Sequence, residues 1–362
     1  MPPELPANCL SPEPAINPLA QLLKQDTTFI DLRAPAEFAR GALPNAVNLP
    51  LLTDEERSRV GITFKRTGQH AAIALGHELV SGATRSRRIR GWLDFAQQHP
   101  DTWLYCWRGG MRSEIAQSWL AAAGTTLPRV TGGFKALRQT CLGVLEEAPG
   151  AKPWLIIGGR TGSGKTQLLK RFACGIDLEG IANHRGSAFG AQLSPQPTPV
   201  DFENALAAAY LKHLDHLVVL EDESRTIGRL ALPQAWHTCM QDSPLLILEL
   251  DVAARAQNIA REYVSEPLAA GESEAALHSR YSASLQRISK RLGGVRYKDV
   301  QSALDADFAN GEHRKWIELL LRWYYDPMYD YQLDRKLERV ITRGTAAELA
   351  QYIDTHAHSA AC

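Results

Sequence analysis

The chain has 362 residues, of which 44% are hydrophobic and 22% are charged, and its formal net charge is zero. This length allows two or three domains with cores of their own, and the composition is that of an ordinary globular protein. No apolar run is long enough to span a bilayer, and residues 1–18 lack the basic start and apolar stretch of a signal peptide. We therefore expect a cytoplasmic protein without membrane contact, in which residues 1–14 form a disordered lead-in. A neutral chain has no overall field that would attract nucleic acid.

The cysteines are scattered and form no Cys-x-x-Cys pair. This spacing argues against a zinc site and against a disulfide framework, and it fits a reducing compartment. The question is then which single thiol is reactive among Cys9, Cys106, Cys141, Cys174, Cys239 and Cys362.

The first part of the chain alternates short apolar runs with segments of helical periodicity. Residues 27–32 and 102–106 are predicted to be buried strands, and the predicted helices cover 69–80, 86–98, 113–123 and 134–146. Such alternation indicates an α/β domain with a parallel sheet, here over residues 15–146. A stretch with proline and glycine, 147–152, is the predicted linker.

The rest of the chain, 153–362, is predicted to be a second α/β domain. Its expected strands lie at 154–159, 216–222, 244–251 and 339–342, and a helix is expected from Ala346. Between the last two strands, residues 253–335 are helical, charged and rich in aromatic side chains. We interpret them as a helical lobe inserted before the last strand.

A phosphate-binding loop lies between the first strand and the first helix of this second domain. Its sequence matches Gly-x4-Gly-Lys-Ser/Thr, and the strand before it and the helix after it are the context that the motif requires. Backbone N–H groups and a helix N-terminus favour phosphate, the lysine adds positive charge, and the threonine hydroxyl suits Mg²⁺. The motif residues are Gly159, Gly162, Ser163, Gly164, Lys165 and Thr166.

An acidic group follows the strand that ends near residue 221. A P-loop usually has such an acid on a neighbouring strand, and Glu221 is nearer the strand than Asp222 and Glu223. We predict that Glu221 and Thr166 hold Mg²⁺. A solvated, acidic strand end is the alternative.

Cys106 ends a predicted strand and is followed by a loop with two glycines and then a helix. Such a turn directs several N–H groups at one point and favours a thiolate, and Arg108 and Arg112 add positive charge. We predict that Cys106, Arg108 and Arg112 are catalytic and that the remaining cysteines are inert.

The segment 29–50 carries the pattern Asp31-x-Arg33-x3-Glu37-Phe38-x2-Gly41-x2-Pro44 and resembles the start of rhodanese-like domains. In that family the cysteine at the strand end carries a persulfide, and the aspartate and arginine are structural. The spacing Cys106-x5-Arg112 also resembles cysteine phosphatases, some of which share this fold. The upstream pattern alone leaves both readings open.

A rhodanese-like domain joined to a P-loop domain, at this length, resembles the tRNA 2-selenouridine synthase family. The resemblance covers nearly the whole chain and includes three further motifs at 184–190, 223–228 and 324–331. It implies a cytoplasmic transferase acting on tRNA with 2-thiouridine at the wobble position. Geranyl diphosphate first alkylates the sulfur, and selenophosphate then replaces the S-geranyl group with selenium.

On this resemblance the P-loop holds the diphosphate, and the Cys106 loop delivers selenium as a perselenide or by binding selenophosphate. An enzyme that supplies selenophosphate is a possible partner. Arg85, Arg87, Arg88 and Arg90 are the candidate RNA contacts, and a solvated helix face is the alternative for each. His184 and Arg185 are candidate substrate-binding residues that could meet a phosphate near the P-loop, and a structural role is the alternative for both. Two other classes stay open: a sulfurtransferase or phosphatase fused to a kinase-like domain and acting on small molecules, and a nucleotide-sensing module.

Overall fold

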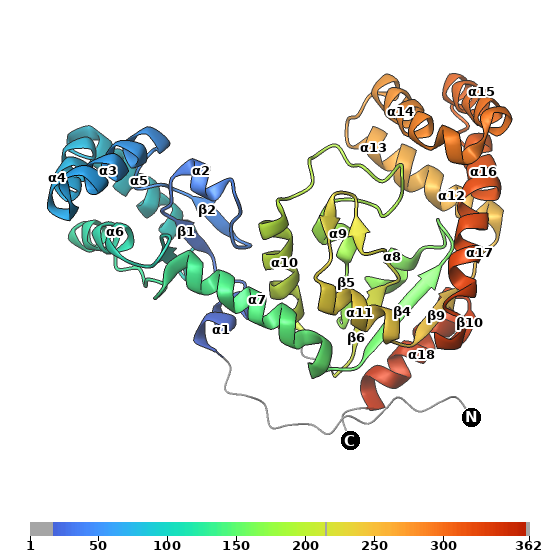
Figure 1. Cartoon of the computed structure of the whole chain (residues 1–362), viewed down its shortest axis with the longest axis horizontal. Coiled ribbons are helices and arrows are strands. Elements are labelled where there is room, and N and C mark those ends of the chain that lie inside the picture. The colour runs from blue at the N-terminus through green and yellow to red at the C-terminus, as the bar shows by residue number, and fades with distance from the viewer. Residues whose placement is uncertain (1–16, 214–215, 360–362) are drawn as a thin grey trace. The chain divides into compact units, whose positions relative to one another are not determined.

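The computed structural model describes residues 17–213 and 216–359, and these form two compact units (Figure 1). The N-terminal unit comprises residues 17–148 together with 197–212, and the C-terminal unit comprises 149–196 and the described residues from 213 onward. The chain therefore leaves the C-terminal unit once and returns to it.

The N-terminal unit is built on a parallel sheet with the strand order β2-β1-β3. Its strands are β1 (Phe29–Asp31), β2 (Ala46–Asn48) and β3 (Trp103–Tyr105), and Ile30 of β1 pairs with Val47 and Leu104. The strands expected at 27–32 and 102–106 are confirmed, although both are shorter. Strand β2 was not predicted, because three partly exposed residues carry no periodic signal.

Helices surround this sheet, and Trp92, Leu104 and Trp119 lie in the core beneath them. The expected break at 147–152 is instead helical as far as Ala151, with Pro149 inside the helix. The helices of the unit are α1 (Pro18–Lys24), α2 (Pro35–Phe38), α3 (Asp54–Thr67), α4 (Gln69–Leu79), α5 (Gly82–Gln98), α6 (Met111–Ala122), α7 (Gly133–Ala151) and α10 (Pro199–Lys212).

Helix α10 belongs to the N-terminal unit although its sequence lies inside the second α/β region. Buried Asn204 explains this placement, since its amide donates to Ala42 O at 2.7 Å and accepts from Arg138 at 2.8 Å. A buried amide with both partners in one unit fixes the helix to that unit.

The C-terminal unit has a parallel five-stranded sheet with the order β10-β9-β4-β6-β5. The phosphate loop follows the middle strand, which places it at the carboxyl edge of the sheet, where α/β folds bind ligands. The strands are β4 (Trp154–Gly159), β5 (Gly175–Ile176), β6 (Val218–Glu221), β9 (Leu245–Leu248) and β10 (Val340–Gly344), and β7 (Thr226–Ile227) and β8 (Leu230–Ala231) form a separate hairpin. Helices α8 (Lys165–Leu169), α9 (Leu178–Ala182), α11 (Gln234–Asp242), α18 (Ala346–Ser359) and a 3₁₀ turn (Leu337–Arg339) complete this part.

The expected helical lobe is confirmed between β9 and β10. Two π-helical segments in it each run directly into an α-helix that has a proline in its first turn, Pro267 in one and Pro327 in the other. A proline has no N–H to donate to the preceding turn of the helix. Short π-helical segments within α-helices are often found at functional sites. The lobe consists of α12 (Val252–Ala260), η1 (Arg261–Ser265), α13 (Glu266–Ala269), α14 (Glu274–Leu292), α15 (Gly294–Asn310), α16 (Lys315–Leu320), η2 (Leu321–Tyr325) and α17 (Asp326–Asp334).

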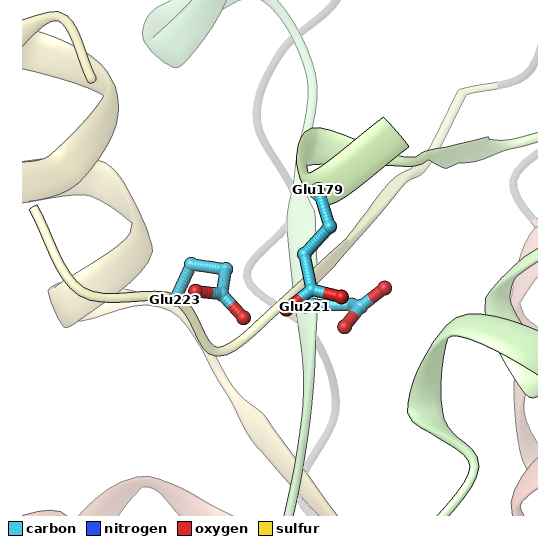
Figure 2. A group of neighbouring side chains, drawn as sticks. All are labelled: Glu179, Glu221 and Glu223. Atoms are coloured by element: carbon cyan, nitrogen blue, oxygen red, sulfur yellow. The ribbon is translucent and has the colours of Figure 1, made fainter. Parts of the chain in front are cut away.

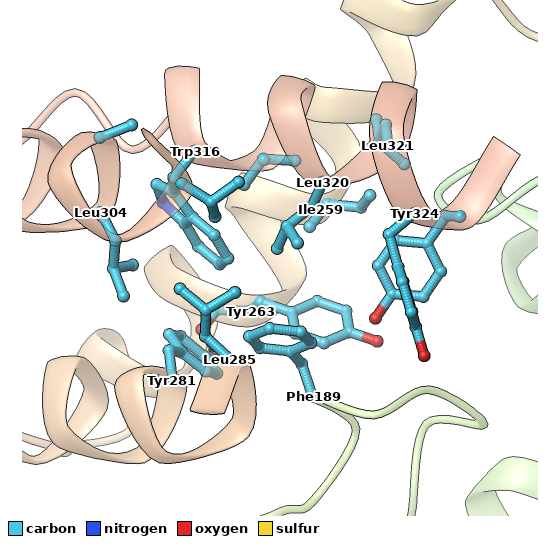
Figure 3. Close-up of a cluster of buried hydrophobic side chains, with 14 of the residues drawn as sticks. Phe189, Ile259, Tyr263, Tyr281, Leu285, Leu304, Trp316, Leu320, Leu321 and Tyr324 are labelled. Atoms are coloured by element: carbon cyan, nitrogen blue, oxygen red, sulfur yellow. Dashed lines mark hydrogen bonds between the residues drawn. The ribbon is translucent and has the colours of Figure 1, made fainter. Parts of the chain in front are cut away.

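The lobe has its own aromatic core, in which Phe189, Tyr281 and Trp316 pack together (Figure 3). Tyr324 and Tyr325 lie in this core as well, so their rings are packed rather than presented to solvent. The predicted architecture, an α/β domain with a parallel sheet followed by a second α/β domain with a helical lobe, is confirmed. In the part of the chain that the structure describes, every helix is too short or too polar to cross a membrane.

Candidate functional site

Cys106 lies directly after β3 and before α6, at the base of a cavity in the N-terminal unit. Its side chain is 3% exposed, and its Sγ is 3.4 Å from Ser113 Oγ and 3.8 Å from Gly110 O. Ser113 donates to the same carbonyl at 2.8 Å. The thiol is therefore held at the first turn of α6, where the helix N-terminus favours an anion.

The loop around the thiol is fixed by the start of α7. Phe134 N–H donates to Cys106 O at 2.9 Å, and Gly133 lies so close that a Cβ there would be 2.2 Å from the same oxygen. Gly133 also has a φ of +59°, a left-handed conformation that other residues adopt only at a cost. No sequence motif marks this glycine, which comes 27 residues after the thiol.

The cavity above Cys106 has a volume of about 650 Å³, and arginines dominate its charge. Its charged lining residues are Arg33, Glu37, Arg40, Arg57, Arg108 and Arg112. Arg33 is buried and structural, since it donates to Asp31 at 2.6 Å and 2.8 Å and to Gly41 O at 2.8 Å. The excess of positive charge suits an anionic ligand of modest size.

The two predicted catalytic arginines differ in their surroundings. Arg108 is exposed at the cavity, whereas Arg112 donates to both carboxylate oxygens of Glu37, at 2.5 Å and 3.2 Å. Burial alone would raise the pKa of Glu37, but the hydrogen bond and charge of Arg112 outweigh it, and the pKa is lowered. Arg112 is therefore bound to Glu37 in the wall of the cavity. The Cys-x5-Arg spacing alone did not predict this ion pair.

The phosphate loop of the C-terminal unit runs from the end of β4 to the start of α8. Lys165 Nζ donates to Gly159 O at 3.0 Å, so the lysine folds back over the loop. Ser163 is buried, and its hydroxyl has no hydrogen-bond partner among the described residues. An unsatisfied buried hydroxyl at this position is a polar group available to a ligand.

The helical lobe supports the loop from behind. Arg255 is fully buried; its Nη1 donates to Thr161 O at 3.2 Å, and Asp326 accepts two further bonds from it at 2.8 Å and 2.7 Å. Asn258 donates to Gly162 O at 3.0 Å, and a Cβ on Gly162 would come within 2.7 Å of Arg255 O. The lobe therefore sets the curvature of the phosphate loop.

Three carboxylates lie together beside the loop, from α9, the end of β6 and the segment after it (Figure 2). One oxygen each of Glu179, Glu221 and Glu223 lies within 4.8 Å of the others. Burial, and then the charge of Glu179, raise the pKa of Glu221 to about 8, while Lys165 and a hydrogen bond from Thr166 oppose the rise. The pKa values of Glu179 and Glu223 are also raised, chiefly by burial.

This carboxylate group is a set of oxygen ligands suited to Mg²⁺. Like charges buried at such short range are unfavourable unless a proton or a cation neutralises them. Asp222 is not part of the group, because it pairs with Lys336 at 2.7 Å. Glu179 was missed by sequence analysis, since it lies 42 residues before Glu221 and carries no local signal.

The segment around His184 and Arg185 joins the carboxylates to the lobe. Burial lowers the pKa of His184, and its Nδ1 is buried without a partner among the described residues. The Arg185 guanidinium lies 4.9 Å from the Tyr263 ring and 3.6 Å from Glu266. Gly186 N–H donates to Glu179, so this segment also positions the carboxylate group.

Both parts of the chain match described protein families. Residues 152–360 match the family described as tRNA 2-selenouridine synthase AAA domain, and 16–140 match the rhodanese-like domain. The tRNA 2-selenouridine synthase of Shewanella sp. (strain MR-7) is 46% identical over 91% of this chain and 94% of its own length. The protein of the same name from Cupriavidus necator is 46% identical over 92% of this chain and 96% of its own.

The chain belongs to the tRNA 2-selenouridine synthase family. The resemblance drawn from the sequence motifs is therefore confirmed, and with it the assignment as an enzyme, for which a transferase classification fits the family name. The motif at 324–331 gains a physical explanation in this family member, because its Asp326 holds the arginine behind the phosphate loop.

The arginines of α5 in this synthase family member do not act as one surface. Arg88 pairs with Glu56 at 2.6 Å and its side chain is 12% exposed, whereas Arg87 and Arg90 are exposed and one helical turn apart. Arg85 lies over the Trp119 ring at 4.4 Å. These positions leave Arg87 and Arg90 as the side chains of this run that can reach an external phosphate without breaking a bond to the protein.

Proposed function

We propose that this chain converts wobble 2-thiouridine of tRNA to 2-selenouridine in the cytoplasm, with geranyl diphosphate and selenophosphate as co-substrates. The observation that carries the proposal is that each unit holds its own anion site. One is the phosphate loop with its carboxylate group, and the other is the arginine-lined cavity above Cys106. Two phosphorylated reagents used in sequence require two such sites.

The first reaction is assigned to the phosphate loop. The 2-thio sulfur attacks C1 of geranyl diphosphate, the C–O bond breaks with its electron pair going to diphosphate, and the N3 proton is released. Backbone N–H groups of the loop, with Lys165, stabilise the leaving diphosphate. Thr166, Glu179, Glu221 and Glu223 are the residues that would hold Mg²⁺, and the bound ion would neutralise further charge on that group.

The hydrocarbon chain of the donor needs apolar surface near the loop. A cavity of about 20 Å³ between Thr161 and the aromatic core of the lobe is lined by Phe189, Tyr263 and Tyr325. This space holds roughly one water molecule, so entry of a prenyl chain requires these side chains to move. Leu193, four residues after Phe189, is 63% exposed and does not line this cavity.

The second reaction is assigned to the Cys106 cavity. The selenium of selenophosphate attacks C2 of the S-geranyl nucleoside, the C2–S bond breaks, and geranyl thiolate leaves. Water then cleaves the Se–P bond to give phosphate and 2-selenouridine. A perselenide on Cys106 would require the thiolate to take selenium while phosphorus keeps the electron pair, as phosphite. We therefore propose that the cavity binds selenophosphate itself, with Cys106 at its base.

The test separates the two reactions with one variant. Lys165→Ala should lose geranylation, and hence selenation of 2-thiouridine tRNA, yet retain selenation of tRNA that is already geranylated. Lys170→Ala is the control, since this exposed lysine ends the same helix, pairs with Asp177 and also interacts with the charges of Glu221 and Glu179, so the variant removes a nearby positive charge without changing a loop residue. Mass analysis of tRNA nucleosides gives the readout. Failure of Lys165→Ala on geranylated tRNA would refute the assignment of the two steps to separate sites.

A further inference from the structure

A second pocket in the N-terminal unit adjoins the Cys106 cavity and has almost entirely carbon walls. Its volume is about 240 Å³. Met111 and Arg112, at the start of α6, line both this pocket and the Cys106 cavity, so the two spaces meet at the first turn of that helix. The apolar walls include Leu52, Val60, Phe64, Ala72, Ile115 and Trp119.

The periodicity of α6 connects the two spaces. Met111, Ile115 and Trp119 are four residues apart and so lie on one face of the helix. They form a stripe that begins beside the thiol and ends at Trp119, which is buried and stacked on Trp92 at 6.3 Å. An apolar chain lying along this stripe would have one end at the Cys106 cavity.

The pocket leaves apolar side chains in contact with water. Phe64, on α3, lines the pocket and is 55% exposed, and Met111 is 38% exposed. Exposed apolar surface of this kind, gathered around a concave site, marks a place where something apolar binds. Its polar lining side chains are Gln69, His77 and Arg112, and because the wall is almost entirely apolar the pocket offers few hydrogen bonds.

We propose that this pocket holds the prenyl chain of the S-alkylated nucleoside while its C2 atom faces the Cys106 cavity. The proposal rests on the proposed function, in which the substrate for selenium transfer carries a ten-carbon branched chain. Such a chain, packed at a density of about 0.75, occupies roughly 230 Å³. The pocket, at about 240 Å³, matches this size.

Charge around the pocket favours the rest of the same substrate. The Arg85 guanidinium lies over the Trp119 ring at 4.4 Å, and Arg112 lies where the two spaces meet. At longer range, positive charge beside an apolar pocket attracts a molecule that joins a hydrocarbon chain to a polyanion, while the exposed Arg87 and Arg90 remain the arginines of α5 that can contact its phosphates. The pocket also orders the two reactions, because 2-thiouridine without the chain would leave it unfilled and bind less well.

The sharpest variant fills the pocket without disturbing its walls. Gly76, on α4, lines the pocket, and a Cβ added there meets nothing within 4 Å. Gly76→Leu therefore adds a side chain into open space and improves helix propensity. Gly143→Leu is the matched control, because Gly143 lies in α7, its Cβ also meets nothing, and it does not line this pocket.

Selenation is measured on tRNA carrying S-geranyl or S-methyl 2-thiouridine. Each buried methylene is worth about fourfold in affinity, so blocking several should lower kcat/KM for the S-geranyl substrate by at least about tenfold in Gly76→Leu. The S-methyl substrate, which does not reach the pocket, should change less than about twofold, as should both substrates with Gly143→Leu. An S-geranyl rate equal to that of Gly143→Leu, or equal losses on both substrates, would overturn the proposal.

Direct binding separates failure of the pocket from failure of the proposed function. The S-geranyl-2-thiouridine nucleoside is titrated into the full chain by calorimetry, with no selenium donor present. If no alkylated tRNA is converted but Gly76→Leu weakens nucleoside binding about tenfold, the result supports the assignment of the pocket to the prenyl chain and refutes the proposed function. If the nucleoside binds both proteins equally, the pocket assignment fails regardless of activity.

Discussion

The buried ion pair behind the phosphate loop gives a prediction with an internal control. Asp326 and Asp330 are one helical turn apart in α17, and each pairs with an arginine near the loop. The Arg255 side chain is 0% exposed, whereas Arg160 and Asp330 are 44% and 50% exposed. Removal of the two carboxylates therefore tests the same kind of pair in two surroundings.

Asp326→Ala leaves the guanidinium of Arg255 buried without its partner, which costs about 3–5 kcal/mol of unfolding free energy. For a unit of about 200 residues this lowers Tm by roughly 6–20 °C. Asp330→Ala breaks an exposed pair and should cost at most about 1 kcal/mol. Thermal unfolding of the full chain, followed through the transition of the C-terminal unit, gives both numbers.

A double variant separates stability from positioning. Arg255→Met combined with Asp326→Leu removes both charges, so it should recover most of the lost stability. The double variant lacks the hydrogen bond from Arg255 to Thr161 O, so its KM for geranyl diphosphate should be higher than that of the unsubstituted chain even though its stability is recovered. Equal Tm losses in Asp326→Ala and Asp330→Ala would refute the reasoning, because burial would then make no difference.

Three further predictions concern the sites themselves. Cys106→Ser should lower selenation and keep geranylation, measured on tRNA nucleosides, because the thiol lines the cavity assigned to selenophosphate. Cys141→Ser, at a buried thiol whose pKa burial raises to about 12, should keep both. Burial and the carboxylate neighbours raise the pKa of Glu221 to about 8, so the Mg²⁺-free chain should lose stability as pH rises from about 4.5 through 8. Glu221→Gln should flatten this dependence of stability on pH, measured by denaturant titration at each pH. An unchanged dependence would contradict the raised pKa. Replacing Arg87 and Arg90 by Gln should reduce the slope of log affinity for tRNA against log salt by up to about 2, and an unchanged slope would mean that neither contacts a phosphate.

The sequence predicted those parts of the sites that are contiguous in the chain. A phosphate loop and a cysteine loop are short motifs in which backbone N–H groups and one side chain carry the chemistry, so Lys165 and Cys106 could be found without a structure. Glu179 and Arg255 could not, because each reaches its site only through folding, and an isolated glutamate or arginine has no distinguishing neighbours. The attachment of helix α10 escaped prediction for the same reason, since Asn204 and Asp201 bond to residues that lie far away in the sequence.

Different residues hold the Cys106 loop and the phosphate loop in place, so substitutions can affect the two reactions separately. The Cys106 loop is held by bonds within the N-terminal unit, through Ser113, Phe134 and the Glu37–Arg112 pair. The phosphate loop is held by the lobe of the C-terminal unit, through Arg255 and Asn258. A substitution that loosens one loop breaks no bond that holds the other, because the two sets share no residue. With geranylation measured on 2-thiouridine tRNA and selenation measured on tRNA that is already geranylated, loss of one reaction identifies the loop that a substitution affects. Loss of both reactions from a substitution outside the two loops would then indicate damage to tRNA binding or to folding.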